Sequence, residues 1–237
     1  MVAQNIRDFV DRVVASVGDQ LESITFYPHP FTNGGLVVVP KPDVEFIPDL
    51  ISQVYRLDPS PVMIYFLRGI ELFELSLPGV FGWTIPLEEK PHLAFWLKKN
   101  GTVLFGRDIR PDIRLPADTS PYLEIHIQRI KHCIRNWVLE QLGRQNYQGI
   151  VREMERQTRY VMATALLAKA REWEYAKEDI PGRFKEVFKD QTAEQVWADL
   201  TCLTQQVEER QEQASRESAF EAVWFFEQFI KQMGAYA

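Results

Sequence analysis

Cysteine is scarce in this sequence: only Cys133 and Cys202 occur among 237 residues. Two cysteines allow one disulfide at most, which excludes a small secreted scaffold held together by disulfides. Long apolar runs are also missing, because no stretch approaches the roughly eighteen residues that a membrane-spanning helix needs. The segment up to Gly18 lacks the charged start and apolar run of a signal peptide. We therefore expect a cytoplasmic protein without a membrane partner.

An excess of positive charge is missing as well. Lysine and arginine number 27 against 33 aspartates and glutamates, which gives a formal net charge of −6. Such a chain has no general attraction for nucleic acid or anionic lipid, so no nucleic-acid partner is expected. What is present is typical of a folded globular protein, with 46% hydrophobic and 25% charged residues. The length allows two domains of ordinary size.

The N-terminal half alternates between helical and strand-like patterns. Apolar residues recur every three or four positions in some segments, whereas β-branched and aromatic residues form short continuous runs in others. The strand over 36–39 is apolar at every position, which predicts that both faces of its sheet are covered. The pattern predicts a small α/β arrangement. The expected elements are helices over 3–17, 45–57, 69–75 and 91–100, and strands over 23–27, 36–39, 61–67 and 103–105.

The C-terminal half has a helical pattern only. A linker is expected over 107–119, which contains Pro111 and Pro116. Beyond it, apolar stripes predict long helices, and Thr192 is a candidate N-cap for the third of them. We therefore predict an α+β protein, with an α/β domain over 1–115 and an all-α bundle over 116–237. The expected helices run from about 123 to 143, from 150 to about 175, from Thr192, and over 204–214 and 217–232.

Two segments carry a resemblance to a known family. Residues 93–109 read LAFWLKKNGTVLFGRDI, and residues 159–170 read RYVMATALLAKA. The first segment, within this two-part organisation, resembles the nucleotidyltransferase-like proteins of the DNA polymerase β superfamily. The second is similar to the substrate-domain helix of kanamycin-nucleotidyltransferase-type and HEPN bundles. The resemblance implies a nucleotidyltransferase-like N-terminal domain followed by a HEPN-like helical domain.

The active-site motif of that family is degenerate in this sequence. Active members carry Gly-Ser after one strand, Asp-x-Asp on the next and a third carboxylate later, because two divalent metals need closely spaced acids. Here the Gly-Ser position falls on residues 27–30, which contain neither glycine nor serine. The Asp-x-Asp positions best match Asn33 and Gly35, and residues 62–67 contain no acid. The resemblance therefore implies a non-catalytic protein without a metal or other cofactor, which acts by binding a nucleotide or a protein.

Two alternatives remain open. Asp43, Glu45 and Asp49 could form a displaced metal site, in which case the protein is an active nucleotidyltransferase that uses magnesium with its nucleotide, with Asp43 and Glu45 as its first candidate ligands. The competing interpretation places these acids in a solvated loop before a helix N-terminus. The second alternative is a helical interaction protein without nucleotide function. If a pocket exists in the first domain, its candidate residues are Tyr27, His29, Gly34, Asp43 and Glu45.

Arginines are locally concentrated in the first two helices of the bundle. In the resembled architecture these helices face the nucleotide, so the arginines are candidates for phosphate binding. The competing interpretation is a solvated surface paired with acids of the C-terminal helices. The candidate phosphate ligands are Arg129, Arg135, Arg152 and Arg156.

The last expected helix has little polar surface. A helix that is apolar on most sides is buried in a bundle or against another subunit. Because this helix lies near the end of the chain, a homodimer interface is a reasonable hypothesis. The residues proposed for that interface are Phe220, Trp224, Phe225 and Phe229.

Overall fold

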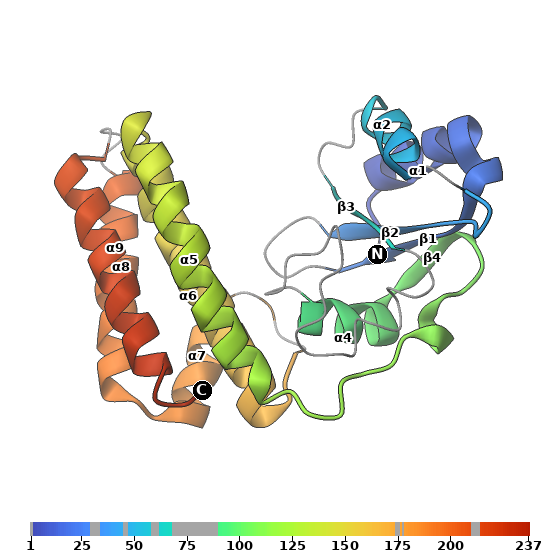
Figure 1. The fold of residues 1–237 in the computed structure, drawn as a ribbon. Coiled ribbons are helices and arrows are strands. Elements are labelled where there is room, and N and C mark those ends of the chain that lie inside the picture. The colour runs from blue at the N-terminus through green and yellow to red at the C-terminus, as the bar shows by residue number, and fades with distance from the viewer. Residues whose placement is uncertain are drawn as a thin grey trace. The chain divides into compact units, whose positions relative to one another are not determined.

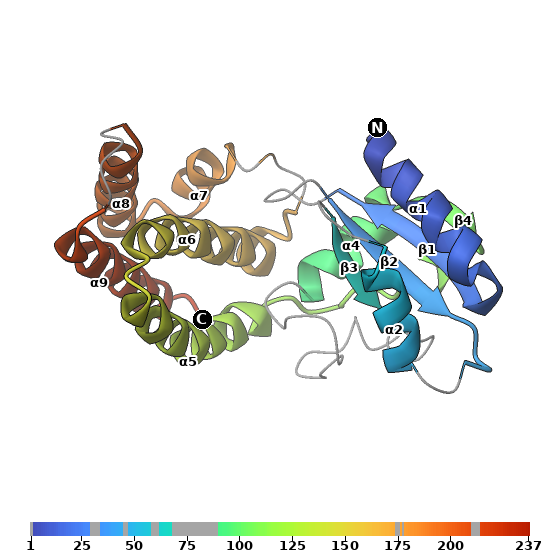
Figure 2. The ribbon, with the colours of Figure 1, turned by 90° about the horizontal axis from the view of Figure 1, so that it is seen from above.

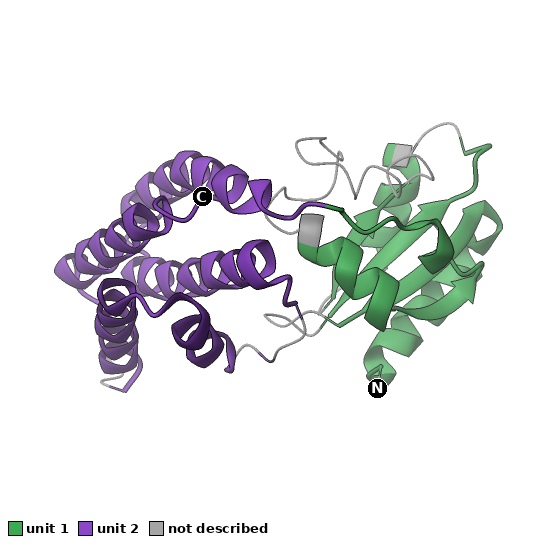
Figure 3. Cartoon of the chain, turned by 90° about the horizontal axis from the view of Figure 1, so that it is seen from below, with its two compact units in different colours: residues 1–117 green, residues 118–237 purple. Residues whose placement is uncertain are grey.

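The computed structural model describes residues 2–28, 34–44, 47–57, 62–67, 90–173, 176, 178–209 and 214–237. The chain forms two compact units, residues 1–117 and 118–237 (Figure 3). The expected α+β class is confirmed, because a small mixed sheet lies in the first unit and helices follow it. The two units are described separately below.

The first unit is built on a mixed sheet (Figure 1). Its described strands are β1 (Leu21–Tyr27), β2 (Gly35–Pro40), β3 (Met63–Phe66) and β4 (Thr102–Gly106). The strand order is β3-β2-β1-β4. Strand β1 pairs antiparallel with both β2 and β4, and β2 pairs parallel with β3. The four strands predicted from the sequence are thus confirmed, and all belong to one sheet; residue 61 lies outside the described residues.

Helices cover both faces of this sheet (Figure 2). They are α1 (Gln4–Val17), followed by a 3-10 turn η1 (Gly18–Gln20), α2 (Ile47–Tyr55) and α4 (Lys90–Asn100). Alternate strand residues, such as Ile24, Leu36 and Val38, pack against α1 and α2 in one hydrophobic core. The residues between them face α4, and all six positions of β2 are buried. The prediction of a strand covered on both faces is confirmed.

Several elements predicted for this unit include residues that the structure does not describe. The helix expected over 45–57 begins at Ile47, and residues 45 and 46 are not among those described. The helix expected over 69–75 also lies outside the described residues. The expected linker contains a short 3-10 turn, η2 (Arg110–Asp112), and otherwise no helix or strand.

The second unit consists of helices arranged around α6. The described helices are α5 (Pro121–Gly143), α6 (Tyr147–Ala170), α7 (Ile180–Phe188), α8 (Gln191–Glu209) and α9 (Arg216–Met233). Helix α6 contacts each of the other four, and its residues from Tyr160 to Leu167 are all buried. It therefore forms the centre of the bundle. Helix α7 was not predicted from the sequence. Within the described residues, no helix combines the length and apolar character needed to cross a bilayer.

Three predicted helix boundaries in this unit were wrong. Thr192 is not an N-cap, because α8 already begins at Gln191 and the Asp190 carboxylate accepts a hydrogen bond from the Ala193 backbone N–H at 3.0 Å. Helix α6 ends at Ala170, five residues before the expected position, where Arg171 adopts a left-handed conformation with φ 55°. No separate helix starts at 204, since α8 continues to Glu209.

Candidate functional site

The degenerate motif lies where β1 ends and β2 begins. Tyr27, the last residue of β1, is directly opposite Gly35, the first residue of β2. Gly34 precedes it with a φ of +104°, a conformation that favours glycine. Asn33 and His29 lie outside the described residues. Tyr27, Gly34 and Gly35 therefore lie together at one end of the sheet.

Stacked aromatic rings occupy this end of the sheet on the α4 side. The Tyr27 ring is stacked with Tyr65 of β3, with ring centroids 6.3 Å apart, and with Trp96 of α4, at 6.2 Å. The ring of His92, one turn earlier on α4, stacks on Trp96 at 5.2 Å. All four residues are at most 4% exposed. We call Tyr65, Tyr27, Trp96 and His92 the aromatic ladder.

Gly35 is required by the position of the Tyr27 ring. A Cβ atom at residue 35 would meet Cζ, Oη and Cε1 of Tyr27 at distances that real Cβ atoms do not show. Ring atoms at the far end of a side chain can often move aside. Here the ring is fully buried and stacked with the rings of Tyr65 and Trp96, so displacing it would disturb their packing as well. The packing therefore excludes an aspartate side chain at position 35.

The acids of the proposed displaced site do not lie beside this motif. Asp43 is exposed in the turn that follows β2, beyond the end of the strand opposite to Gly35. The six residues of β2 span roughly 20 Å, so Asp43 and Gly35 are at opposite ends of the sheet. Glu45 lies outside the described residues. No cluster of three or more histidine, cysteine or acidic residues suited to a metal occurs in the part of the chain that the structure describes.

The segment that best matches the family has a structural role in this unit. Gly106 has a φ of +71°, and a Cβ there would clash with the carbonyl of Glu22 on β1. The next residue, Arg107, forms ion pairs with Glu22 at 2.7 Å and with Asp112. Asp108 pairs with Arg110, whose hydrogen bonds lower the pKa of that carboxyl to about 2. These contacts join β4 to β1 and fix the start of the linker.

The candidate phosphate-binding arginines of the second unit contact carboxylates. Arg152 on α6 lies 3.2 Å from Glu208 of α8, and Arg156 forms a two-pronged contact with Glu153 at 2.6 and 2.9 Å. Arg135 on α5 lies 3.8 Å from Glu227 of α9. Arg152 and Arg156 lie one turn apart on α6 and Arg135 lies on α5, and each of the three arginines is within ion-pair distance of an acid. Arg129 approaches the buried His126, whose pKa it helps to lower.

A buried histidine lies on α5 beside α6. His126 is 1% exposed, and its Nδ1 lies 2.7 Å from the Thr164 hydroxyl, which itself donates to the Tyr160 carbonyl at 3.0 Å. Because that hydroxyl proton is used, Nδ1 carries the proton and donates. No described residue hydrogen-bonds Nε2. Burial first, and the charge of Arg129 second, lower the pKa of His126 to about 3. It is a neutral interior residue at physiological pH.

The aromatic residues of α9 divide between the bundle and the surface. Phe229 is fully buried, so its expected place in a subunit interface was wrong. Phe225 is partly buried, and its ring lies edge-on to Trp224 at 5.2 Å. Phe220 and Trp224 are 48% and 55% exposed. Two of the four proposed interface residues are therefore available on the surface.

Two hollows occur among the described residues of the second unit. One, of about 590 Å³, lies between α6, α7 and α8 and includes Trp197 and the Lys185–Glu194 ion pair. The other, of about 470 Å³, is a groove between α5 and α9. Its floor is apolar, whereas its rim carries more basic than acidic side chains. The lining of this α5–α9 groove is Lys131, Ile134, Arg135, Phe226, Glu227, Gln228, Ile230, Lys231 and Gly234.

Comparison with known proteins adds no identification. No family model matches the chain, and no curated protein matches it at a significant level.

Proposed function

We propose that this chain is a non-catalytic nucleotidyltransferase-like protein that acts by binding, with a protein as the favoured partner. The proposal rests on the sequence resemblance, to which the sheet adds support. Strands β1, β2 and β3 are neighbours in a mixed sheet, as the resemblance requires. The segment over residues 93–109 forms a helix and a strand that pairs with β1. This arrangement is the one that the resemblance leads us to expect, and it supports the proposal over a helical interaction protein with an accidental likeness.

The observation that carries the non-catalytic part is the contact between Tyr27 and Gly35. A two-metal site needs carboxylates a few ångströms apart at this end of the sheet. Tyr27 instead fills the space that a side chain at position 35 would occupy. The neighbouring strand β3 offers Met63 and Tyr65 rather than an acid. The described residues at this position thus supply aromatic packing in place of metal ligands.

The same observation favours a protein over a nucleotide as the partner. A nucleobase commonly stacks on exposed aromatic rings, but the rings of the aromatic ladder are buried against one another. Phosphate binding commonly uses arginines that converge on one point, whereas Arg135, Arg152 and Arg156 contact carboxylates on different helices. Neither part of a nucleotide has an evident receptor among the described residues.

Calorimetric titration tests the proposal directly. The purified full chain is titrated with ATP, GTP, CTP and UTP, each with and without magnesium. The expected result is no binding that depends on magnesium. Magnesium-dependent binding of any of the four would overturn the non-catalytic proposal. Magnesium-independent binding that is lost in Arg152→Ala or Arg156→Ala would overturn the preference for a protein partner and indicate a nucleotide sensor.

The alternative of an active enzyme predicts a different response. If Asp43 and Glu45 bind magnesium, then Asp43→Asn removes the magnesium-dependent heat and any nucleotidyl transfer. Asp11→Asn is the matched control, because Asp11 is an exposed acid of α1 that does not belong to the candidate metal site. Loss of activity in the first variant alone would support the enzyme. The location of Asp43 at the far end of β2 argues against it.

A further inference from the structure

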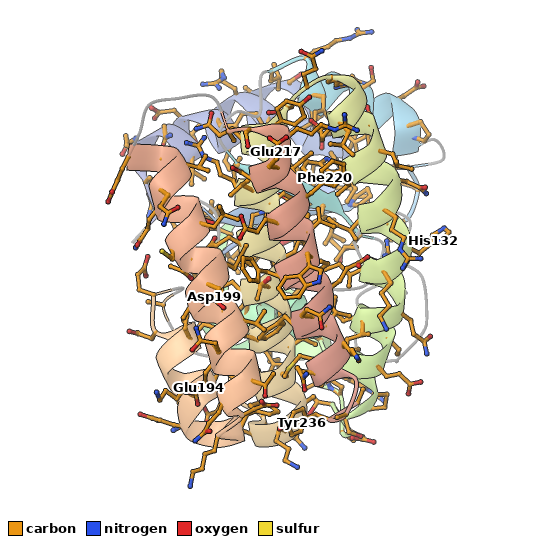
Figure 4. All side chains as sticks on the ribbon, turned by 90° about the vertical axis from the view of Figure 1, so that its left-hand side faces the viewer. His132, Glu194, Asp199, Glu217, Phe220 and Tyr236 are labelled. Carbon is orange, nitrogen blue, oxygen red and sulfur yellow. The ribbon has the colours of Figure 1, made fainter. Side chains whose placement is uncertain are left out.

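The exposed side of α9 carries two of the large exposed apolar side chains of the described second unit. Phe220 and Trp224 lie one helical turn apart and point to the same side. Figure 4 shows Glu217 and Phe220 near the same end of this helix. Leu139 of the neighbouring α5 is also largely exposed. A surface cluster of large apolar side chains is typical of a protein interaction site.

The position of Leu139 extends this cluster across two helices. Helices α5 and α9 run antiparallel (Figure 1), and the contact between Arg135 and Glu227 marks one point of their register. One turn further along α5, the same register places Leu139 beside Val223 and Trp224. The apolar surface therefore continues from α9 onto α5. We call Leu139, Phe220, Val223 and Trp224 the α9 face.

Charges of opposite sign flank the two ends of the α9 face. Glu217 and Glu221 are exposed at its N-terminal end, together with Arg216, which lies 5.3 Å from the Phe220 ring. Hydrogen bonds from its own backbone N–H and from Ser215 lower the pKa of Glu217, which is therefore ionised at neutral pH. At the other end, the α5–α9 groove carries Lys131 and Lys231, neither of which forms an ion pair with another described residue.

The charges at the two ends of the α9 face are complementary to those of a second α9 face that lies antiparallel to it. Glu217 and Lys231 are each seven residues, or about two helical turns, from Trp224. Positions seven apart lie on nearly the same side of a helix. When two such helices pack antiparallel with their Trp224 residues adjacent, each Glu217 lies opposite the partner's Lys231, and the pair forms twice. Self-complementarity of this kind is characteristic of a two-fold interface.

We infer that the α9 face binds the α9 face of a second copy of this chain, with the two helices antiparallel about a two-fold axis near Trp224. Phe220 then lies opposite Gln228 of the other copy, at the edge of the apolar centre. Glu227 lies opposite Glu221, and the contact of Glu227 with Arg135 offsets that repulsion. The inference depends only on the second unit and gives the proposed binding function one partner, so its test is separate from nucleotide titration.

The first experiment measures the association state of the full chain by sedimentation velocity over a range of concentrations. We expect a reversible dimer. Trp224→Ala should weaken dimerisation by roughly a hundredfold, because the residue is lost twice at the centre of the interface. Tyr55→Ala is the matched control, since Tyr55 is similarly exposed at 50% but lies in the first unit. A wild-type monomer up to roughly 100 µM, or a dimer unaffected by Trp224→Ala, would overturn the inference.

A charge exchange tests the antiparallel register. Glu217→Lys and Lys231→Glu should each weaken the dimer by about tenfold, because each creates two repulsive pairs. The double variant restores the attraction with the signs exchanged, so its affinity should return to within about threefold of the wild-type value. Lys169→Glu is the control, because Lys169 also lies in the last turn of its helix but is remote from the α9 face. If the effects of the two substitutions add rather than compensate, the antiparallel arrangement is wrong.

Discussion

Two groups of aromatic side chains, one in each unit, have opposite placements. In the first unit, Tyr27, Tyr65 and Trp96 are stacked and buried at the end of the sheet, where the resembled family has its catalytic metals. In the second unit, Phe220 and Trp224 are exposed on the surface of α9. The same residue types thus fill a site in one unit and form a surface in the other.

This difference indicates where binding is expected. Rings packed against one another at close to full burial contribute to the stability of the first unit and are not accessible to a ligand. Exposed rings add little to folding stability but have a large effect when a partner covers them. We therefore expect the aromatic ladder to contribute to folding stability and the α9 face to contribute to partner binding.

The largest expected effect comes from removing one tryptophan of each kind. Trp96→Ala should lower the free energy of unfolding by about 3 to 5 kcal/mol, because it opens a cavity beside Tyr27 and His92. Trp224→Ala should lower it by less than about 1 kcal/mol at concentrations where the chain is monomeric. Urea unfolding followed by circular dichroism measures both. Equal losses would remove the distinction between the two regions.

Gly35 offers a sharper test of the packing at the sheet end. Gly35→Ala should lower the free energy of unfolding by about 2 to 3 kcal/mol, because the added Cβ overlaps the confined Tyr27 ring. Gly182→Ala is the control, since a Cβ there meets no atom within 4 Å. Combining Gly35→Ala with Tyr27→Ala should cost less than the sum of the two single changes. Strict additivity would show that the ring does not restrict residue 35.

The third test concerns the interior of the second unit. The folded pKa of His126 is about 3, below its value of about 6.5 in the unfolded chain. Between these two values the unfolded state binds more protons, so stability falls as the pH is lowered. From pH 7.5 to 5 the expected loss is about 2 kcal/mol. His126→Gln should remove this slope, whereas substitution of the exposed His132 should not. An unchanged slope in His126→Gln would contradict the assignment.

The smallest expected effect concerns the start of α8. Asp190→Ala should lower the free energy of unfolding by about 1 kcal/mol, because the Ala193 N–H loses its acceptor. The same carboxylate also accepts a hydrogen bond from the Tyr236 hydroxyl at 3.0 Å. Thr192→Ala should change the stability by less than about 0.5 kcal/mol. The opposite ranking would restore Thr192 as the cap that the sequence suggested.

Much of the first unit could be predicted from the sequence because its strands are short, apolar and bounded by proline and glycine. The continuous run over 36–39 indicated a covered strand, and Gly101 indicated the end of a helix. The aromatic ladder could not be predicted. Tyr65 and Trp96 are distant from Tyr27 in sequence, and only the strand order and the parallel pairing of β2 with β3 bring the rings together.

In the second unit, helix existence was easier to predict than helix ends. The boundary between α7 and α8 depends on the conformation of Lys189 and the side chain of Asp190, which leave only a weak pattern in the sequence. Composition alone could not show which phenylalanines of α9 are buried and which are exposed. Phe229 faces the bundle and Phe220 faces outward, and that division depends on which side of α9 contacts α6 and α8.

The most direct test of the central claim is whether the protein binds a divalent metal together with a nucleotide. Manganese can replace magnesium, and its electron paramagnetic resonance spectrum in the presence of ATP reports its surroundings. The account predicts that adding the full chain leaves the spectrum of manganese–ATP unchanged. Stoichiometric broadening of that spectrum, abolished by Asp43→Asn, would contradict the account and identify an active metal site.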